Sequence, residues 1–285
     1  MNLPRITIVT PSFNQAKYLP ETIESILNQG YPNLEYIIID GGSTDGSVDI
    51  IRKYEKYLAY WVSEKDSGQS EAINKGFGRA TGNLMTWVNS DDVLLPGALK
   101  RIAESKARHP ECQWLTGKIA RMDKDGRIID LKGAEKPRGF LCKMGVSPVH
   151  APSSFFSKSL YDMAGGMDLD LYYTMDVDLW WKFLQASCIP KLVNRYLYGF
   201  RIHAGSKTTA SFASENVDYD AEKDPKWERI GKEKERCMRM YNCGVKNRLY
   251  RLGLNVSRIL RLPGYLRAKL LTRRYKNYHW SDVKY

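Results

Sequence analysis

The feature that most constrains this chain is the alternation of short apolar runs with longer amphipathic segments in its N-terminal part. Four runs rich in Ile, Val and aromatic residues have the length and composition of buried strands: 5–10, 34–40, 58–63 and 83–88. Three segments between them carry apolar residues at helical spacing: 18–30, 47–57 and 70–82. Strands that alternate with helices form crossover units, so the sequence predicts an α/β domain built on a parallel sheet.

Polar residues follow each of the four expected strands. The loops read PSFN (11–14), DGGSTDGS (40–47), EKDSGQ (64–69) and NSDD (89–92). In open parallel sheets, ligands bind beyond the carboxyl ends of the strands, so we expect these loops to form one site. Taken singly, the DGGSTDGS loop is equally well explained as a turn with good capping chemistry, and the two adjacent aspartates are better explained as a solvated turn in which Asp92 caps the next helix.

The pattern changes from about residue 110. Residues 112–133 have the pattern of two strands joined by a turn at Lys124-Asp125-Gly126, and 150–166 that of a strand followed by a helix. Residues 176–186 have helical spacing and 191–203 are extended. We expect an antiparallel or mixed continuation of the same domain.

Positive charge is concentrated at the C-terminal end. The formal net charge is +12, and residues 226–285 hold 17 Lys and Arg against 4 Asp and Glu, which leaves residues 1–225 close to neutral. We therefore divide the chain into a main domain, 1–225, and a basic helical extension, 226–285, interrupted by Pro263-Gly264. The near-neutral main domain gives no reason to expect nucleic-acid binding. The polar segment 205–225 is expected to be a loop that closes over the site.

The basic extension carries leucines interleaved with arginines over residues 246–276. This composition is typical of a segment that lies on an anionic membrane surface, although a solvated helix face has the same charge pattern. The five cysteines show no CxxC spacing, the start of the chain does not resemble a signal peptide, and no apolar run is long enough to span a membrane. We expect a cytoplasmic protein that attaches peripherally to the inner face of the cell membrane.

Two downstream stretches carry further candidates. Asp176 and Asp178 precede an aromatic helix, and a carboxylate at a helix N-terminus suits either a general base or a cap. Trp180 could stack on a sugar ring or belong to the core, and with His150 it is our candidate for the acceptor or sugar side. His203 lies in a Gly/Ser/Lys-rich turn, where it could bind a metal or a phosphate or have no role.

In this order the motifs resemble family 2 glycosyltransferases of the GT-A fold, over roughly residues 5–208. The stretches that carry the resemblance are TIVTPSFNQ, IIIDGGSTDGS, SEKDSGQSEAINKGF, NSDD, and MDVDLWWKF followed by RIHAGSKT. The resemblance implies a Rossmann-like, mostly parallel sheet with helices on both faces. It also implies an inverting, metal-dependent enzyme that moves a sugar from a nucleoside diphosphate sugar to an acceptor hydroxyl. The acceptor would be a saccharide, free or lipid-linked, in the synthesis of a surface polysaccharide or glycan.

The resemblance also implies roles for the strand-end loops. Pro11 and Phe13 would line the nucleotide, and Asp40 would contact the base with help from Asp66. Asp91 would face the ribose or the sugar.

The remaining implied roles concern the metal and the base. Asp92, the last acid of the DxD-like motif, would hold Mn²⁺ or Mg²⁺, and His203 would reach the metal or the diphosphate. Asp176 matches the catalytic base. Met175 stands where the family often has an acid, so Asp178 stays open as an alternative base, with Asp176 preferred.

Three other functions remain as alternatives. A nucleotidyltransferase would carry a Gly-rich basic loop near the N-terminus, but residues 11–20 hold a single Lys17 and no glycine. A non-catalytic nucleotide-sugar binding subunit is disfavoured because the acidic motifs are intact. A nucleic-acid module is supported only by the basic extension. No QxxRW motif is present, so a processive polymer synthase is not expected.

Overall fold

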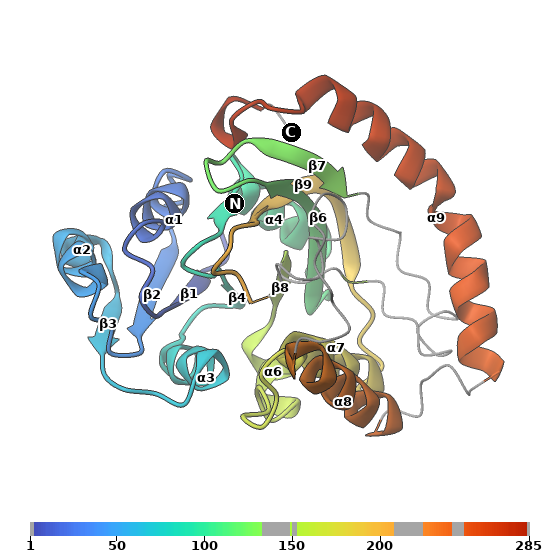
Figure 1. The fold of residues 1–285 in the computed structure, drawn as a ribbon, viewed down its shortest axis with the longest axis horizontal. Helices are drawn as coiled ribbons and strands as arrows, with labels where there is room; N and C mark the ends of the chain where they lie inside the picture. The colour runs from blue at the N-terminus through green and yellow to red at the C-terminus, as the bar shows by residue number, and fades with distance from the viewer. Residues whose placement is uncertain (1–2, 133–148, 150–152, 208–224, 241–247, 284–285) are drawn as a thin grey trace.

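The computed structural model describes residues 3–132, 149, 153–207, 225–240 and 248–283. Its centre is a nine-stranded sheet with the order β3-β2-β1-β4-β8-β6-β9-β5, and β7 pairs with β6 (Figure 1). The strands are β1 (Ile6–Ser12), β2 (Leu34–Asp40), β3 (Tyr60–Ser63), β4 (Leu84–Trp87), β5 (Val93–Leu94), β6 (Trp114–Met122), β7 (Ile128–Lys132), β8 (Ser154–Phe156) and β9 (Lys191–Arg201).

The first four strands are mutually parallel, as the alternation of strands and helices predicts. β1 pairs with both β2 and β4, and β2 pairs with β3. In the register, Ser12 lies opposite Asp40, and Asp40 lies opposite Ser63, so β1, β2 and β3 end together. The loops that follow these strands therefore meet at one edge of the sheet.

Helices cover both faces of the sheet. They are α1 (Leu19–Leu27), α2 (Ser47–Tyr54), α3 (Gln69–Arg79), α4 (Ala98–Arg108), α6 (Lys158–Met163), α7 (Met175–Gln185), α8 (Pro225–Met240) and α9 (Arg248–Tyr275), with 3₁₀ turns at Glu55–Tyr57 and Trp280–Asp282. Apolar residues of α1, α2 and α4 pack on one face, and those of α3, α6, α7 and α8 on the other. The arrangement confirms the predicted α/β class with helices on both faces.

The second half of the sheet is mixed, as expected from its sequence. β8 runs antiparallel to β4 and β6, β5 runs antiparallel to β9, and β6 runs parallel to β9. The predicted turn between β6 and β7 is present. Gly126 has φ +78°, a left-handed conformation that glycine adopts without strain.

The predicted break at Pro263-Gly264 is wrong. α9 is one helix from Arg248 to Tyr275, and Pro263 lies inside it. A proline inside a helix removes one backbone hydrogen bond, and the helix can continue past it with a kink. Figure 1 shows that α9 bends along its course at the outer edge of the molecule and brings its C-terminal end beside β7.

The basic extension packs on the main domain. Leu271, Tyr275, Trp280 and Val283 contact a core cluster formed by residues of β5, β6, β7 and β9. Asn277 N–H donates to the carbonyl of Ile128, at 2.9 Å. Residues after 225 therefore contribute to the folded body as well as to the charge. In the described part of the chain, no helix is both long and apolar enough to cross a bilayer.

Candidate active site

A cavity of about 590 Å³ opens at the edge where the parallel strands end. Its volume is in the range of small-molecule sites. The lining includes residues of all four predicted loops, the first turn of α7 and the segment after β9, among them Pro11, Phe13, Asp66, Asp91, Asp92, Asp176 and Lys207. The structure thus brings together groups that are up to 196 positions apart in the chain.

One wall carries Pro11, Phe13 and Asp66. The Phe13 ring is 60% exposed, which leaves a face available for stacking. Asp66 accepts a hydrogen bond from Gly68 N–H at 2.9 Å, and its partial burial raises the pKa of its carboxyl. A Cβ on Gly41 would lie 2.9 Å from Asp66 Oδ2, so the absence of a side chain at position 41 lets this carboxylate approach the backbone.

Asp40 does not take the predicted position. It is fully buried, and its carboxylate accepts hydrogen bonds from Gly42 N–H, Ser43 N–H, Ser43 Oγ and Ser63 Oγ at 2.6–3.1 Å. These donors occupy both oxygens, so Asp40 shapes the turn after β2 rather than facing the cavity. The predicted base contact is therefore corrected in favour of Asp66, which does line it.

The Asp92 carboxylate is likewise hydrogen-bonded to other residues of the protein. It is 1% exposed and accepts hydrogen bonds from Asn89 Nδ2 (2.9 Å), Tyr198 Oη (2.7 Å) and Arg201 N–H (2.8 Å). Burial and the neighbouring charge of Asp91 raise the pKa of the Asp92 carboxyl well above its ordinary value. In this structure the contacts engage both carboxylate oxygens, and Asp92 also lines the cavity, so its role as a metal ligand stays a prediction. Its main role here is to join β9 to the turn after β4.

Asp91 and His203 face each other instead. His203 Nε2 lies 3.0 Å from Asp91 Oδ2, and the Asp91 side chain keeps 18% exposure. Arg201 Nε donates to the Asp91 carbonyl at 2.8 Å and fixes its backbone. A carboxylate and an imidazole are suitable ligands for Mn²⁺, and one or two protein ligands plus phosphate oxygens complete many Mg²⁺ sites.

The tautomer of His203 bears on that fit. Gly205 N–H donates to His203 Nδ1 at 3.2 Å, so the proton is assigned to Nε2 in this structure. A cation bound at Nε2 requires the proton on Nδ1, and the Gly205 contact would then be lost. In the described residues no group of three or more His, Cys, Asp or Glu side chains could hold a metal by themselves. A bound cation would therefore need oxygens from its ligand.

The two candidate bases at the start of α7 are clearly separated. Asp176 lines the cavity, and Val177 N–H donates to its Oδ1 at 2.7 Å. Burial raises the pKa of the Asp176 carboxyl, while the Lys207 charge acts in the opposite direction. Asp178 is fully buried on the far side of the helix and forms an ion pair with Lys182 at 2.8 Å. Of the two, only Asp176 faces the cavity.

Trp180 is part of the core. Its side chain is 1% exposed and stacks between Trp87 and Trp114, with ring centroids 5.6 and 5.2 Å away. The ring is therefore closed to a sugar, and the prediction of a sugar contact is corrected. His150, the other residue predicted for the acceptor side, lies outside the described residues. The same holds for residues 208–224 of the predicted loop 205–225, whereas its residues 205–207 line the cavity and Pro225 begins α8.

Lys207 is a site residue for which we predicted no role. Its Nζ donates to Gln69 Oε1 at 2.8 Å and to the Tyr172 carbonyl at 3.3 Å, and it lies 3.8 Å from the centroid of the Tyr172 ring. Burial lowers the pKa of Lys207 to about 8, against the charges of Asp176 and its neighbours. The sequence signal for Lys207 was its place in the polar Gly/Ser turn that follows His203. Its contacts with Gln69 and Tyr172 could not be predicted, because these residues come from distant loops.

Glu233 of α8 is the second residue that sequence reasoning missed. Its carboxylate accepts hydrogen bonds from the backbone N–H groups of Tyr172, Tyr173 and Thr174 at 2.7–3.1 Å, and from Arg229 Nε at 3.2 Å. This contact holds the segment that leads into Asp176. No local pattern in α8 distinguishes Glu233 from the other glutamates of that helix.

The chain matches the family model described as glycosyl transferase family 2 over residues 7–162. An uncharacterised glycosyltransferase of Mycobacterium tuberculosis is 34% identical over 180 residues, which are 61% of this chain and 66% of that protein. TuaG of Bacillus subtilis, a glycosyltransferase named for teichuronic acid biosynthesis, is 34% identical over 132 residues, or 45% of this chain and 51% of TuaG.

Solved structures agree with the predicted fold. S. aureus TarS 1–349 in complex with UDP-GlcNAc superposes with a TM-score of 0.58 at 16% sequence identity, covering 82% of this chain and 72% of that chain. At this identity the likeness concerns the fold alone. Together with the family match, it confirms the predicted GT-A architecture.

Proposed function

The chain belongs to glycosyl transferase family 2, and from that premise we propose that it transfers a sugar, with inversion, from a nucleoside diphosphate sugar to an acceptor hydroxyl. The observation that carries the proposal is the content of the strand-end cavity. It holds a carboxylate free to act as a base (Asp176), a carboxylate facing an imidazole (Asp91 and His203) and a half-buried cation (Lys207).

The donor is proposed to be a UDP-sugar. TarS, whose fold this chain shares, is solved in complex with UDP-GlcNAc, so UDP-GlcNAc is the first donor to test. Phe13 would stack on the base, with Pro11 beside it, and Asp66 would accept a hydrogen bond from the base. Asp91 lines the same cavity. We propose that it contacts the ribose or the sugar in addition to the metal.

Asp91 and His203 would hold Mn²⁺ or Mg²⁺ together with the diphosphate oxygens. When bound, such a cation neutralises charge on the departing diphosphate. Lys207 supplies a second positive charge in the same cavity and would contact the diphosphate directly. Because Gln69 and Tyr172 already orient its ammonium group, little reorganisation is required.

Asp176 is proposed to be the general base. The bond between the acceptor oxygen and the anomeric carbon forms as the bond from that carbon to the diphosphate oxygen breaks, and the nucleoside diphosphate leaves with the electron pair. Asp176 takes the hydroxyl proton. Since burial raises the pKa of Asp176, the active carboxylate form is lost as the pH falls through this raised value.

The acceptor is proposed to be a saccharide in the synthesis of a surface polysaccharide. TuaG, which shares 34% identity over 132 residues, is named for teichuronic acid biosynthesis. A lipid-linked saccharide would fit the basic extension, which carries the predicted membrane segment 246–276. The proposed location is the cytoplasmic face of the cell membrane.

The deciding experiment is the Asp176→Asn variant. We expect its turnover to fall by about 10²–10⁴-fold, because general base catalysis typically contributes that factor. Affinity for UDP should stay within about twofold, since the exchange keeps the shape of the side chain. The measurements are metal-dependent release of UDP from a panel of nucleoside diphosphate sugars, and calorimetric titration with UDP.

A suitable control is Asp170→Asn, an exposed aspartate six positions before the base. Its turnover should equal that of the unmodified protein. Turnover of Asp176→Asn within about threefold of this control would remove Asp176 as the base. If the unmodified protein released no nucleotide from any donor in the panel but still bound UDP, the sugar-transfer proposal would give way to a nucleotide-sugar binding role.

A further inference from the structure

A second cavity lies away from the strand-end site. It has a volume of about 330 Å³ and opens between the sheet, α4 and α9. Its lining comes from α4, β6, β7, β9 and the C-terminal half of α9: Arg101, Lys118, Leu131, Asn194, Arg195, Tyr196, Arg267, Leu271 and Tyr275. We call it the cationic pocket.

The charge of the cationic pocket has one sign. Four of the described lining residues are Lys or Arg and none is acidic. Lys118, Arg195 and Arg267 have no acidic side chain within ion-pair distance among the described residues, whereas Arg101 has Glu104 at 3.4 Å. Among the described residues, these three clustered cations are therefore not neutralised by nearby carboxylates.

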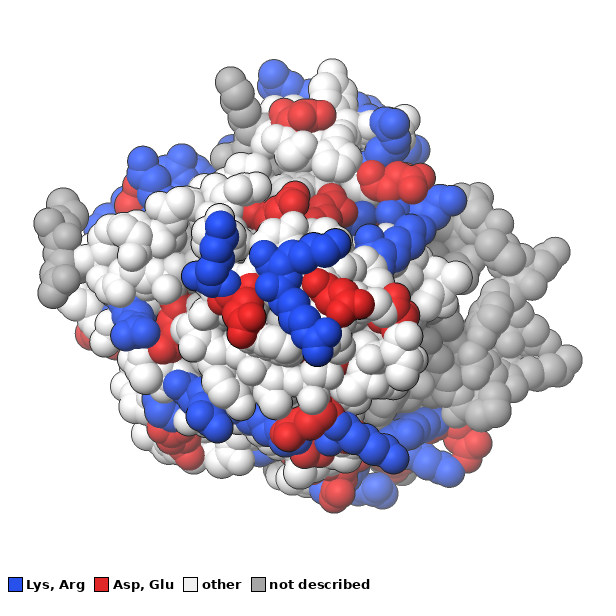
Figure 2. Space-filling view, turned by 90° about the vertical axis from the view of Figure 1, so that its left-hand side faces the viewer, with Lys and Arg blue, Asp and Glu red and all other residues white. Residues whose placement is uncertain are grey.

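Several cations elsewhere on the surface are paired with acids. Arg52 pairs with Asp49 at 3.0 Å, and Lys75 pairs with Glu71 at 2.9 Å. Figure 2 shows acidic and basic side chains interspersed on the face that it displays. Because like charges repel at short range, a cluster of cations without acids is costly unless an anion joins it.

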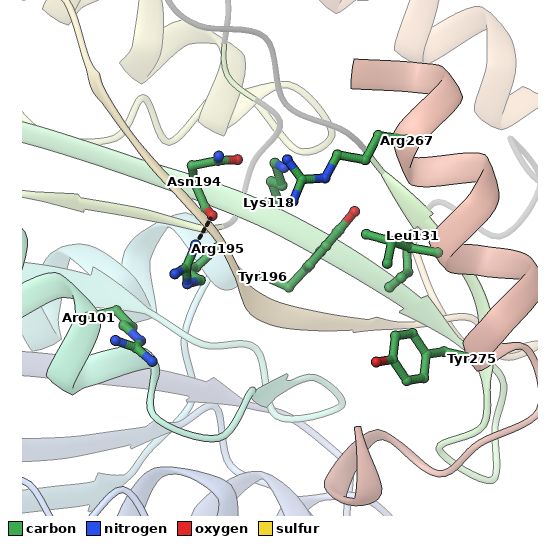
Figure 3. Close-up of a pocket in the computed structure, with 9 residues that line it drawn as sticks. Arg101, Lys118, Leu131, Asn194, Arg195, Tyr196, Arg267 and Tyr275 are labelled. Carbon is green, nitrogen blue, oxygen red and sulfur yellow. Dashed lines mark hydrogen bonds between the residues drawn. The ribbon is translucent and has the colours of Figure 1, made fainter. Parts of the chain in front are cut away.

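The pocket is also a fixed structure. Figure 3 shows Arg267 extending from α9 toward Lys118 of β6, with Tyr196 of β9 below them, and Lys118 Nζ lies 5.4 Å from the Tyr196 ring centroid. The α9 wall is held to β7 because Leu131 N–H donates to Thr272 Oγ1 at 2.9 Å. The cations are therefore presented by elements of the folded core.

We propose that the cationic pocket binds a phosphate group. Guanidinium groups match phosphate oxygens in bidentate geometry, and an ammonium group adds a compact charge. Leu131, Leu271 and Tyr275 give the same pocket an apolar wall, which suits a phosphate attached to an apolar moiety. Burial, together with the charges of Arg267 and Arg195, lowers the pKa of Lys118, and a bound anion would reverse that effect.

The phosphate could belong to a lipid headgroup or to a soluble molecule. The α9 surface beside the pocket favours the lipid. Its exposed apolar side chains, which the fold leaves uncovered, are Leu262, Tyr265, Leu266 and Leu270. Lys269, Arg273 and Arg274 are exposed on the same helix. Basic pockets next to interfacial apolar residues are a recurring way to bind phosphorylated lipid headgroups.

The test compares two double variants with equal loss of charge. The pocket pair, Lys118→Gln with Arg267→Gln, removes two cations that line the pocket. The control pair, Lys269→Gln with Arg273→Gln, removes two exposed cations of α9 that do not line it. Inorganic pyrophosphate is titrated calorimetrically into the full chain. We expect the pocket pair to weaken binding by about tenfold or more, and the control pair by less than about threefold. Thermal unfolding of both variants verifies the fold.

A second arm separates the sources of the phosphate. Vesicles of phosphatidylcholine with and without phosphatidic acid are sedimented with each protein. Loss of acid-dependent sedimentation in the pocket pair, with retention in the control pair, assigns the pocket to a lipid phosphate. Pyrophosphate binding that depends on the pocket without vesicle binding assigns it to a soluble phosphate compound. Equal pyrophosphate affinity and equal sedimentation of the two folded variants would overturn the proposal, whatever the outcome for sugar transfer.

Discussion

Adjacent carboxylates have different roles in this protein. Asp91 keeps 18% side-chain exposure and its carboxylate contacts His203 Nε2, while the carboxylate of Asp92 accepts three hydrogen bonds. The cost of placing two acids side by side is reduced because donors stabilise one of them and solvent reaches the other. We therefore propose Asp91 as the acid that binds a ligand, while the hydrogen bonds of Asp92 hold the turn after β4.

This division predicts opposite outcomes for two exchanges. Asp91→Asn should weaken Mn²⁺-dependent UDP binding by about tenfold and leave the unfolding midpoint unchanged, because it removes a partly exposed ligand. Asp92→Asn should lower the free energy of unfolding by about 1–3 kcal/mol, because a buried hydrogen-bond network loses one of its acceptor oxygens. Calorimetry and urea unfolding measure the two quantities. If Asp92→Asn lost Mn²⁺-dependent UDP affinity and Asp91→Asn kept it, Asp92 rather than Asp91 would be the metal ligand.

Lys207 predicts a pH dependence of donor binding. Its pKa is lowered to about 8, so the side chain is charged below pH 8 and neutral above it. A diphosphate prefers the charged form, and UDP affinity should therefore be highest below pH 8. It should fall by about tenfold between pH 7 and pH 9 if one proton is linked to binding.

The matched variant is Lys207→Arg, which stays protonated over this range. Its UDP affinity should be nearly constant from pH 7 to pH 9, whereas Lys207→Met should bind weakly throughout. Calorimetric titrations at three pH values provide the comparison. The same decline in Lys207→Arg as in the unmodified protein would show that another group titrates.

At the scale of elements, α8 positions the first turn of α7 although the two are separated by more than 30 residues. Glu233 accepts three backbone N–H groups from the segment 172–174, directly before Asp176. Residues 172–174 lie outside the helices and strands, and the carboxylate of α8 accepts hydrogen bonds from their backbone N–H groups. Burial acts to raise the pKa of the Glu233 carboxyl, but the hydrogen bonds that it accepts lower this pKa below its ordinary value. This contribution to stability is present above the ordinary glutamate pKa and is lost as the pH falls through the lowered value.

Glu233→Ala should therefore lower the free energy of unfolding by about 1–3 kcal/mol and reduce turnover more than UDP affinity. Glu235→Ala is the control, since Glu235 is exposed on the same helix and pairs with Arg239 at 3.4 Å, and should change stability by less than about 0.5 kcal/mol. Urea unfolding and steady-state kinetics distinguish the two. Equal effects of both substitutions would show that Glu233 does not position the α7 segment.

At the scale of the molecule, the C-terminal end reaches the active site through a chain of contacts. Trp280 Nε1 donates to Glu21 at 2.5 Å, and Glu21 also pairs with Arg201 at 2.5 Å. Arg201 in turn donates to the backbone of Asp91 and to the carboxylate of Asp92. The basic extension therefore supports the site as well as carrying the cationic pocket.

Trp280→Ala should lower the free energy of unfolding by about 3 kcal/mol, because it removes a large buried ring and a hydrogen bond. Tyr278→Ala is the control, since Tyr278 is an aromatic residue two positions away with 54% exposure, against 9% for Trp280. Denaturant unfolding gives both values. A chain ending at residue 225 should be less stable than the full chain for the same reason, and equal midpoints would contradict this account.

The sequence by itself determined the α/β architecture, the positions of the four parallel strands and the edge at which their loops meet. Strand and helix periodicity are local properties, and the register of parallel strands follows from their buried faces. The motif order also led to Asp176, Asp91 and His203 as members of one site.

Both Asp91 and Asp92 line the cavity, and only the tertiary structure decided how their carboxylates are bonded. Asp92 accepts hydrogen bonds from Tyr198 and Arg201, which lie 106 and 109 positions away. Asp40 is held by its own turn and by Ser63 of the next strand. The roles of Lys207 and Glu233, and the core position of Trp180, likewise depend on partners from distant elements. The direction of a side chain is set by such long-range contacts, which local patterns in the sequence do not contain.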